Sequence, residues 1–440
     1  MLSRLAGFAA MMPHGVRSVL RNFSYLFGSQ ALTTIVGACY AVFLARVLGP
    51  QLYGTLNYGY AWYLTFIAFT YLGLDVVLGR EVGREPKAGP FLAGATLALR
   101  AAAAAIIAIL SATIACAAES DAQARTLLYV LSAALFGRAV WLWCGSVFVA
   151  YEDTRHQFLI DVAFRPLELA TAVLVLLFVA PKSIVAVGIV HAALWWLQAA
   201  VGLATILKRI TPIEIRGLAR HAPRLILEGL PGALYTLAVI WFLQAPTVWF
   251  RHLVGTGDAL GYFALAIQIV GYLLIVPYLV GSVALPVLSR SAAREDGKTR
   301  IAALATLIGV PAASAILGGL ALWLAAPVTA LVFGARYLEA GRILAEAIWL
   351  LLPLSLAIGL QQIAFSHRGN LRMASLSTIL GILAMAALYA PLTQALSYHG
   401  ALLATGIGMA IWAGGLVLTL GKAGILAKRA PAEARIAPLS

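Results

Sequence analysis

Two arginines lie inside long apolar runs of this 440-residue chain, where a charge needs a physical reason. Arg138 sits near the middle of the run 127–149, and Arg100 lies in the run 92–117. A charge at the centre of a bilayer costs about 2.5 kcal/mol or more, so Arg138 should face the protein interior or water. Guanidinium groups stay protonated and hold phosphate oxygens bidentately, which makes both arginines candidates to bind a phosphorylated ligand. The alternatives are a structural hydrogen bond for Arg138 and snorkelling of Arg100 to the lipid headgroups.

A second pair of arginines occupies matching places in the two halves of the chain. Arg46 ends one apolar run and Arg251 ends another almost half a chain length later, and each is followed by a short turn that contains glycine. Both are expected at the outer surface of the membrane. Such a pair could receive or release an anion there, and the alternative is that both only anchor the chain at the interface.

Three further polar residues are candidates for ion coupling or substrate contact. Glu228 lies in the first turn of the run 226–249 and Asp75 lies near the inner end of the run 56–79. Each could titrate a coupling proton, or pair with a cytoplasmic arginine. Gln244, next to Pro246, could bond sugar hydroxyls, although amides in membranes equally bond helix to helix for about 0.6 kcal/mol.

No motif predicts an enzyme. HExxH, paired CxxC and GxSxG are all missing, and the GKT at 297–299 lacks the first glycine of a phosphate loop. The three cysteines have no paired spacing and the histidines are scattered, so we expect no metal site and no cofactor. The ten tryptophans mostly suit the aromatic belts at the membrane surfaces.

The elements that must position these residues are membrane helices. Hydrophobic residues make up 62% of the chain and charged residues 11%, which excludes a soluble protein of this length. A helix needs about 20 residues to cross a bilayer core of roughly 30 Å. We therefore predict an all-α integral membrane protein with about twelve transmembrane helices in two six-helix lobes around a central cavity. The spans are expected near 23–45, 56–79, 92–117, 127–149, 159–180, 184–206, 226–249, 260–285, 302–325, 344–366, 373–391 and 399–420.

The distribution of charge predicts the orientation of these spans. With the N-terminus in the cytoplasm, basic residues, Arg165 among them, fall on the cytoplasmic side about four times as often as outside, which agrees with the positive-inside rule. Both termini are then cytoplasmic. The net charge of +14 therefore reflects topology, and we expect no nucleic-acid partner.

The expected domain organisation follows from the spans and from the internal repeat around Arg46 and Arg251. Six-span repeats keep their orientation in the membrane, so two lobes would face each other. The predicted segments are 1–22 (cytoplasmic N-terminal segment), 23–206 (N-lobe), 207–225 (cytoplasmic linker), 226–420 (C-lobe) and 421–440 (cytoplasmic tail).

Short motifs in a consistent order resemble a known family. The run ARVLGPQLYG at 45–54 resembles the first-loop signature of Wzx-type bacterial oligosaccharide flippases, in the superfamily that also holds multidrug antiporters and the peptidoglycan lipid flippase. The stretches 72–81, 260–266, 286–290 and 398–404 are similar to later motifs of the same family, as are Phe333, Gly334, Tyr337, Ala340 and Gly369. Many relatives carry an acidic residue near the end of the seventh span, where this chain has Pro246 and Thr247. That departure weakens any ion-coupling role at this position.

The resemblance implies a transporter in the bacterial inner membrane. Its substrate would be an oligosaccharide linked to an undecaprenyl diphosphate type of carrier, moved to the outer leaflet for synthesis of O-antigen or exopolysaccharide. Further partners would be a glycan polymerase and a chain-length regulator. A drug or cation antiporter of the same superfamily is the alternative, although the few intramembrane acids suit an anionic substrate better. A membrane glycan polymerase or ligase would need long external loops, and the predicted ones are short.

Overall fold

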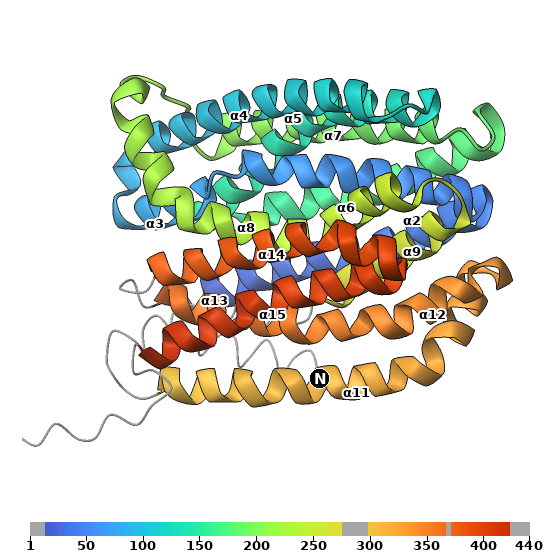
Figure 1. Ribbon diagram of the computed structural model, residues 1–440. Coiled ribbons are helices and arrows are strands. Elements are labelled where there is room, and N and C mark those ends of the chain that lie inside the picture. Colours follow the sequence, from blue (N-terminus) through green and yellow to red (C-terminus); the bar gives the residue numbers. More distant parts are fainter. Residues whose placement is uncertain (1–13, 275–297, 367–370, 423–440) are drawn as a thin grey trace, which may run out of the picture. The chain divides into compact units, whose positions relative to one another are not determined.

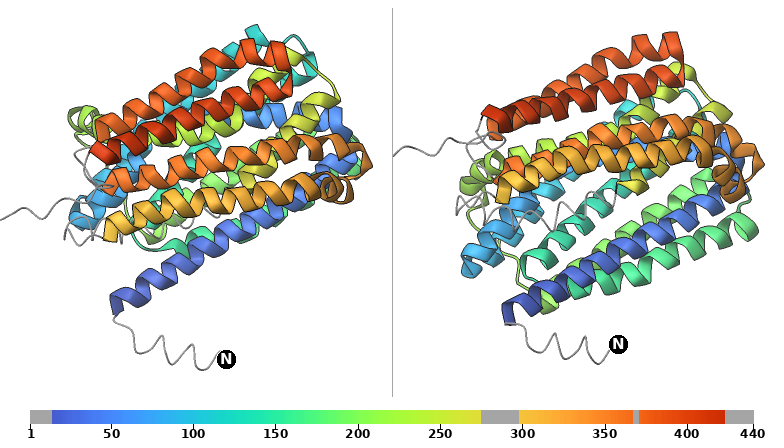
Figure 2. Two further views of the ribbon diagram at one scale, coloured as in Figure 1. Left: turned by 60° about the horizontal axis from the view of Figure 1, so that its bottom comes forward. Right: turned by 90° about the horizontal axis from the view of Figure 1, so that it is seen from below.

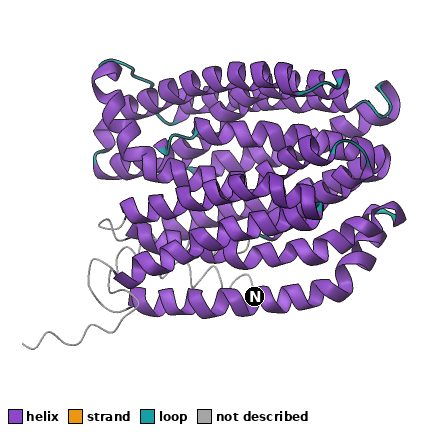
Figure 3. Cartoon of the chain, viewed as in Figure 1, coloured by secondary structure: helices purple, strands orange, loops and turns teal. Residues whose placement is uncertain are grey.

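The computed structural model describes residues 14–274, 298–366 and 371–422 (Figure 1). Over these ranges the chain forms helices joined by short loops and turns (Figure 3). Backbone polar groups in lipid must be satisfied within the chain, and a helix does this residue by residue. Two features named in the sequence analysis fall outside the described residues: the motif at 286–290 and Gly369.

The helices have the following bounds. In the first part of the chain they are α2 (His14–Ile67), η1 (Ala68–Thr70), α3 (Leu74–Arg84), η2 (Pro86–Ala88), α4 (Gly89–Ala118), α5 (Ala122–Ala150), α6 (Thr154–Leu174), the π-helical turn η3 (Val175–Val179), α7 (Ile184–Arg209), α8 (Leu218–Val254) and α9 (Asp258–Leu273). In the second part they are α11 (Lys298–Phe333), η4 (Ala335–Tyr337), α12 (Leu338–Ala347), η5 (Ile348–Leu350), α13 (Leu351–Ser366), α14 (Leu371–Leu396) and α15 (Tyr398–Lys422).

The predicted class, an all-α membrane protein, is confirmed. Nine helical segments of the described residues are long and apolar enough to cross a membrane. Two of these segments, Ser24–Thr70 and Leu371–Lys422, contain 47 and 52 residues. The second covers two predicted spans, and the first covers one span and the larger part of the next. The eighth predicted span, 260–285, begins in α9 and runs past the described residues. The count of twelve therefore stays a prediction.

Two breaks divide the early helices. α2 leaves helical geometry at Gly49, so it consists of two helices that meet at the turn before Pro50. The predicted span 56–79 is wrong as a continuous helix, because the chain breaks between η1 and α3. Leu72 and Gly73 both have positive φ there, 49° and 65°. Glycine takes this backbone conformation without a steric penalty, which lets α3 start in a new direction.

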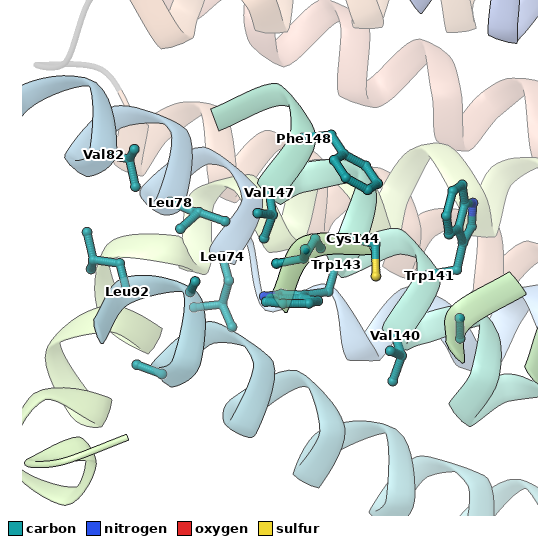
Figure 4. Packing of buried hydrophobic residues seen from close by; sticks show 14 of the residues in the cluster. Leu74, Leu78, Val82, Leu92, Val140, Trp141, Trp143, Cys144, Val147 and Phe148 are labelled. Carbon is teal, nitrogen blue, oxygen red and sulfur yellow. The ribbon is translucent and has the colours of Figure 1, made fainter. Parts of the chain in front are cut away.

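The first compact unit comprises residues up to Arg251 together with 255–265 and 329–338. Within it α4, α5 and α7 lie side by side (Figure 1). Its core includes Leu78 of α3, Leu92 of α4, and Trp143 and Phe148 of α5, all buried (Figure 4). The indole of Trp143 donates a 3.0 Å hydrogen bond to Thr96, so the polar edge of this large ring is also satisfied.

The second compact unit comprises the described residues within 252–254, 266–328 and 339–422. α14 and α15 form an antiparallel pair in it, joined at Ser397 (Figures 1 and 2). The buried Trp412 of α15 donates to Gln361 of α13 over 3.3 Å. The boundaries predicted for lobes and linker, 23–206, 207–225 and 226–420, stay predictions.

The prediction that most tryptophans form interfacial belts is wrong for half of them. Five of the ten have buried side chains: Trp62, Trp141, Trp143, Trp195 and Trp412. The indoles of Trp62 and Trp143 donate hydrogen bonds to Ser111 and Thr96 respectively. Because partners for the indole N–H are available inside the bundle, these rings are buried there and do not lie at the headgroups.

Candidate functional site

A network of buried charged and polar side chains lies inside the first unit, on α2, α5, α6 and α7. Two of its arginines, Arg138 and Arg165, and two of its acids, Asp161 and Glu168, come from helices that the sequence predicts to span the membrane. Charges in such segments are costly unless they are paired or face water. The network is therefore the strongest candidate for a functional site in the described part of the chain.

One end of the network is centred on Asp161 of α6. Its carboxylate accepts a 2.5 Å hydrogen bond from the hydroxyl of Ser29 of α2 and a 2.9 Å bond from the amide of Gln198 of α7. The oxygen of the same amide accepts a 2.6 Å bond from Arg165. Three helices are thus linked through one carboxylate, and every contact is between side chains.

The centre of the network is Glu168, two turns further along α6. One carboxylate oxygen accepts from Arg165 at 2.8 Å, and the other lies 2.6 Å from Nδ1 of His191 on α7. Nε2 of His191 in turn lies 2.9 Å from the indole nitrogen of Trp195. Glu168 therefore holds a cation on one side and an imidazole on the other.

Both arginines of the network lie against the indole ring of Trp195. The guanidinium carbon of Arg138 is 4.4 Å from the ring centroid, and that of Arg165 is 4.3 Å from it. Arg138 also lies 5.5 Å from the centroid of Tyr63. Contacts of this kind stabilise a cation by about 2 kcal/mol when water is excluded.

Arg138 differs from Arg165 in its hydrogen bonds. Arg165 is bound to Glu168 and Gln198, whereas Nε of Arg138 is buried and makes no hydrogen bond to any described residue. The hydroxyl of Tyr63 next to it is also buried and has no partner among the described residues other than Arg138 itself. Two buried donors inside the bundle thus have no acceptor of their own among the other described residues.

Arg100 is bound by residues close to it within the first unit. Its side chain is only 1% exposed, and it donates to Asp75 over 2.6 Å and to the carbonyl of Tyr71 over 3.0 Å. The alternative that Arg100 snorkels to the headgroups is therefore wrong. Ser146 also donates to Asp75, at 2.6 Å, so this carboxylate serves as the acceptor that makes burial of Arg100 tolerable.

Arg46 and Arg251 do not share one environment. Arg46 is exposed and donates to the carbonyls of Val332 and Leu331 over 2.8 and 2.9 Å, at the end of α11. Arg251 is buried and is bound through two nitrogens to the carboxylate of Glu119. Their matching positions in the sequence therefore do not produce matching contacts.

Glu228 and Gln244 both lie within α8, 16 residues apart. Glu228 forms ion pairs with Arg80 of α3 and with Arg224, the latter at 2.7 Å. The carboxylate is thus engaged with two arginines in this conformation. Gln244 is half-buried near Pro246, on a helix that contributes no residue to the network.

The sequence contains a periodic pattern that predicts the network, although an average of hydropathy over a window does not show it. Asp161, Arg165 and Glu168 recur with the spacing i, i+4, i+7, which places them on one face of a helix. The next helix repeats the same spacing with polar or aromatic side chains at 191, 195 and 198. Counting Arg165 as a cytoplasmic charge was wrong, because it lies inside α6. Among the described residues, no group of three His, Cys, Asp or Glu side chains is arranged to bind a metal.

Solved structures with the same fold are membrane transporters. An inward-facing multidrug resistance MATE family transporter of the MOP superfamily matches with a TM-score of 0.64 and 15% identity, over 90% of this chain and 96% of the other. The lipid II flippase MurJ in an inward closed conformation matches with a TM-score of 0.64 and 15% identity, over 89% and 86%. A MOP superfamily transporter from Pyrococcus furiosus, described as having a binding pocket of reverse polarity, matches with 0.62 and 15% identity, over 94% and 97%.

The sequence comparison with protein families is more specific. No curated protein sequence matches the chain. Residues 19–292, more than half of the chain, match the family described as polysaccharide biosynthesis protein. The resemblance seen in the short motifs is thereby confirmed. The chain belongs to the polysaccharide biosynthesis protein family and has the fold of MOP superfamily transporters.

Proposed function

We propose that this protein is a flippase that moves a polyprenyl-diphosphate-linked oligosaccharide from the cytoplasmic to the outer leaflet of the bacterial inner membrane. The family match supports a role in making polysaccharides, and the fold supports transport across a membrane. Movement would occur by alternating access, with both termini in the cytoplasm. The chain acts as a transporter and not as an enzyme in this proposal.

The observation that carries the proposal is the environment of Arg138. A permanent cation lies between aromatic rings inside the bundle. Its Nε has no hydrogen-bond partner among the described residues, and the hydroxyl of Tyr63 has none other than Arg138. A diphosphate offers the acceptors that both donors need. Undecaprenyl diphosphate sugars are therefore the substrate class that this site fits best.

The other candidates have secondary roles in this proposal. Arg165 keeps Trp195 in place under Arg138, and Arg46 and Arg251 stabilise the helix ends that they contact. Gln244 is available for sugar hydroxyls. Asp75 and Glu228 are the ion-coupling residues in this proposal. In this conformation Asp75 is paired with Arg100 and Glu228 with Arg80.

A drug or cation antiporter is the second candidate, because a MATE family transporter has the same fold. The acids of the network would then form the cation site. Within the described residues, however, Glu168 and Asp161 are already bound to Arg165, His191, Ser29 and Gln198. These donors compete with a cation for the same oxygens, which favours the flippase.

Reconstitution tests the choice. Purified protein is placed in vesicles with a fluorescent undecaprenyl diphosphate oligosaccharide on one face, and lectin access to the far face is measured. The flippase predicts exposure above that of empty vesicles, reduced at least tenfold by Arg138→Ala. Exposure equal to that of empty vesicles, together with export of an organic cation from the same vesicles, would establish the antiporter instead.

A further inference from the structure

The hydrogen bonds of His191 fix which of its nitrogens carries a proton. The indole nitrogen of Trp195, 2.9 Å from Nε2, has a hydrogen to donate and no lone pair to accept with. Nε2 must therefore be the acceptor and carries no hydrogen. The one imidazole proton is on Nδ1, from which it is donated to Glu168 over 2.6 Å. His191 is neutral in this arrangement and has a single tautomer.

A second proton on His191 is incompatible with this geometry. Protonated imidazole donates from both nitrogens, so Nε2–H would point at the N–H of Trp195. The hydrogen bond between the two rings must then break and one ring must turn. Trp195 is the ring on which the guanidinium groups of Arg138 and Arg165 lie. The proton state of His191 is thus tied mechanically to the position of Arg138.

Charged groups of α5 and α6 and two tyrosines of α2 lie around His191. From α6, the carboxylate of Glu168 favours a protonated ring and Arg165 opposes it. Arg138 of α5 also opposes it. From α2, Tyr60 and Tyr63 lie 4.9 and 5.6 Å from the imidazole centroid, and the hydroxyl of Tyr60 is 3.1 Å from that of Tyr40. One carboxylate and two guanidinium groups thus act on the ring, so an anion bound near Arg138 favours protonation of His191.

We propose that His191 is a proton-binding site, and that Trp195 transmits its occupancy to the anion site at Arg138. This inference rests on the proposed function, since it makes the diphosphate and the proton coupled ligands. A protonated His191 adds positive charge beside Arg138, so the anion binds more tightly as the pH falls. Coupling between two ligands is reciprocal, so the bound anion also favours protonation of His191.

The first experiment observes the switch without any substrate. Protein in nanodiscs is labelled with 5-fluorotryptophan, and the ¹⁹F resonance of Trp195 is followed over about pH 5–8, the range in which histidine commonly titrates. The resonance is assigned with Trp195→Phe. It should move with pH in the wild type and stay fixed in His191→Gln. Trp196→Phe is the matched control, because the neighbouring indole is exposed and donates to the carbonyl of Ala133.

A second variant keeps the test decisive if His191→Gln does not fold. Trp195→Phe retains an aromatic ring under the guanidinium groups and removes only the indole donor. The imidazole of ¹⁵N-labelled His191 should then titrate at a higher pH than in the wild type. His221→Gln, at an exposed histidine of α8, is the control. A Trp195 resonance that ignores pH, or that moves equally in His191→Gln, would overturn the proposal.

Binding of undecaprenyl diphosphate to the same nanodiscs tests the link to Arg138. Affinity should rise at least about fivefold from pH 8 to pH 5.5 in the wild type and stay constant in His191→Gln. If the lipid binds equally well at both pH values, the coupling is wrong and the flippase proposal stands. If it binds at neither pH while the Trp195 resonance still titrates, the anion site is wrong and the proton switch stands.

Discussion

Arg251 and Glu119 form a two-point ion pair, with 3.1 Å from Nη2 to Oε1 and 3.4 Å from Nε to Oε2. The side chains are 5% and 4% exposed, so neither charge is solvated by bulk water. Asp121 lies 3.9 Å from the same guanidinium, and Tyr58 lies below it at 5.6 Å. The pair joins the carboxyl end of α4 to the carboxyl end of α8.

Breaking this pair should destabilise the protein strongly. Arg251→Ala leaves the carboxylate of Glu119 buried without its main partner, at a cost of about 3–5 kcal/mol. Thermal unfolding in detergent measures the loss, and Arg251→Ala with Glu119→Ala should recover part of it. The exposed pair of Arg342 and Glu339, with Arg342 64% exposed, is the control, and Arg342→Ala should change stability by no more than about 1 kcal/mol. Equal losses at the two sites would contradict this assignment.

Arg138 is expected to act in transport more than in folding. Arg138→Ala removes the only cation of the network that is in no ion pair among the described residues, so export should fall at least tenfold. Arg138→Lys should retain part of the activity, because it keeps the charge and loses the planar fork. Export is measured as surface glycan in a deletion strain carrying each variant, at matched protein levels. Arg209→Ala, in the exposed last turn of α7, should behave as the wild type.

Substitution of Asp75 distinguishes a structural role of this residue from a role in ion coupling. Asp75→Asn leaves the buried guanidinium of Arg100 without a counter-charge, so the unfolding temperature should drop by several degrees. Ser146→Ala removes a single hydrogen bond to the same carboxylate and should cost about 1 kcal/mol. If Asp75→Asn unfolds like the wild type but abolishes transport, Asp75 is a coupling site and not a structural partner.

Gly54 of α2 and Gly261 of α9 lie so close together that neither position has room for a Cβ atom. A Cβ on Gly54 would lie 2.6 Å from the backbone nitrogen of Gly261, and a Cβ on Gly261 would meet the carbonyl of Pro50. Backbone atoms cannot move aside as a flexible side chain does, so Gly261→Ala should force the helices apart. We expect a lower unfolding temperature and faster proteolysis at the adjoining loop. Gly271→Ala, in the same helix with open space at its Cβ, should have neither effect.

The helices were predictable from the sequence because lipid imposes a simple rule of length and apolarity. Span limits agree with the helices to within a few residues at α4, α5 and α7. The break at Gly73 was not predictable from hydropathy, since Leu72 and Leu74 keep the run apolar while the backbone turns. Hydropathy averages over a window, and a change of direction depends on one residue.

Part of the candidate site was predictable, and part depended on tertiary contacts. Arg138 was identifiable by its charge in an apolar run, and its aromatic surroundings were not, because Trp195 is 57 residues away in the sequence. The acids of α6 lie among polar residues that resemble the end of a span. Arg251 was identified, but Glu119, its partner, follows α4 and looks like an ordinary loop acid.

The two sides of the Arg46 contact differ in how freely their residues can be substituted. Its guanidinium binds the main-chain oxygens of Leu331 and Val332, which every amino acid possesses. Positions 331 and 332 are thus free to drift through many side chains without losing this bond, while residue 46 is not. A search for correlated substitutions among related sequences would miss the connection, although it holds two distant parts of the chain together.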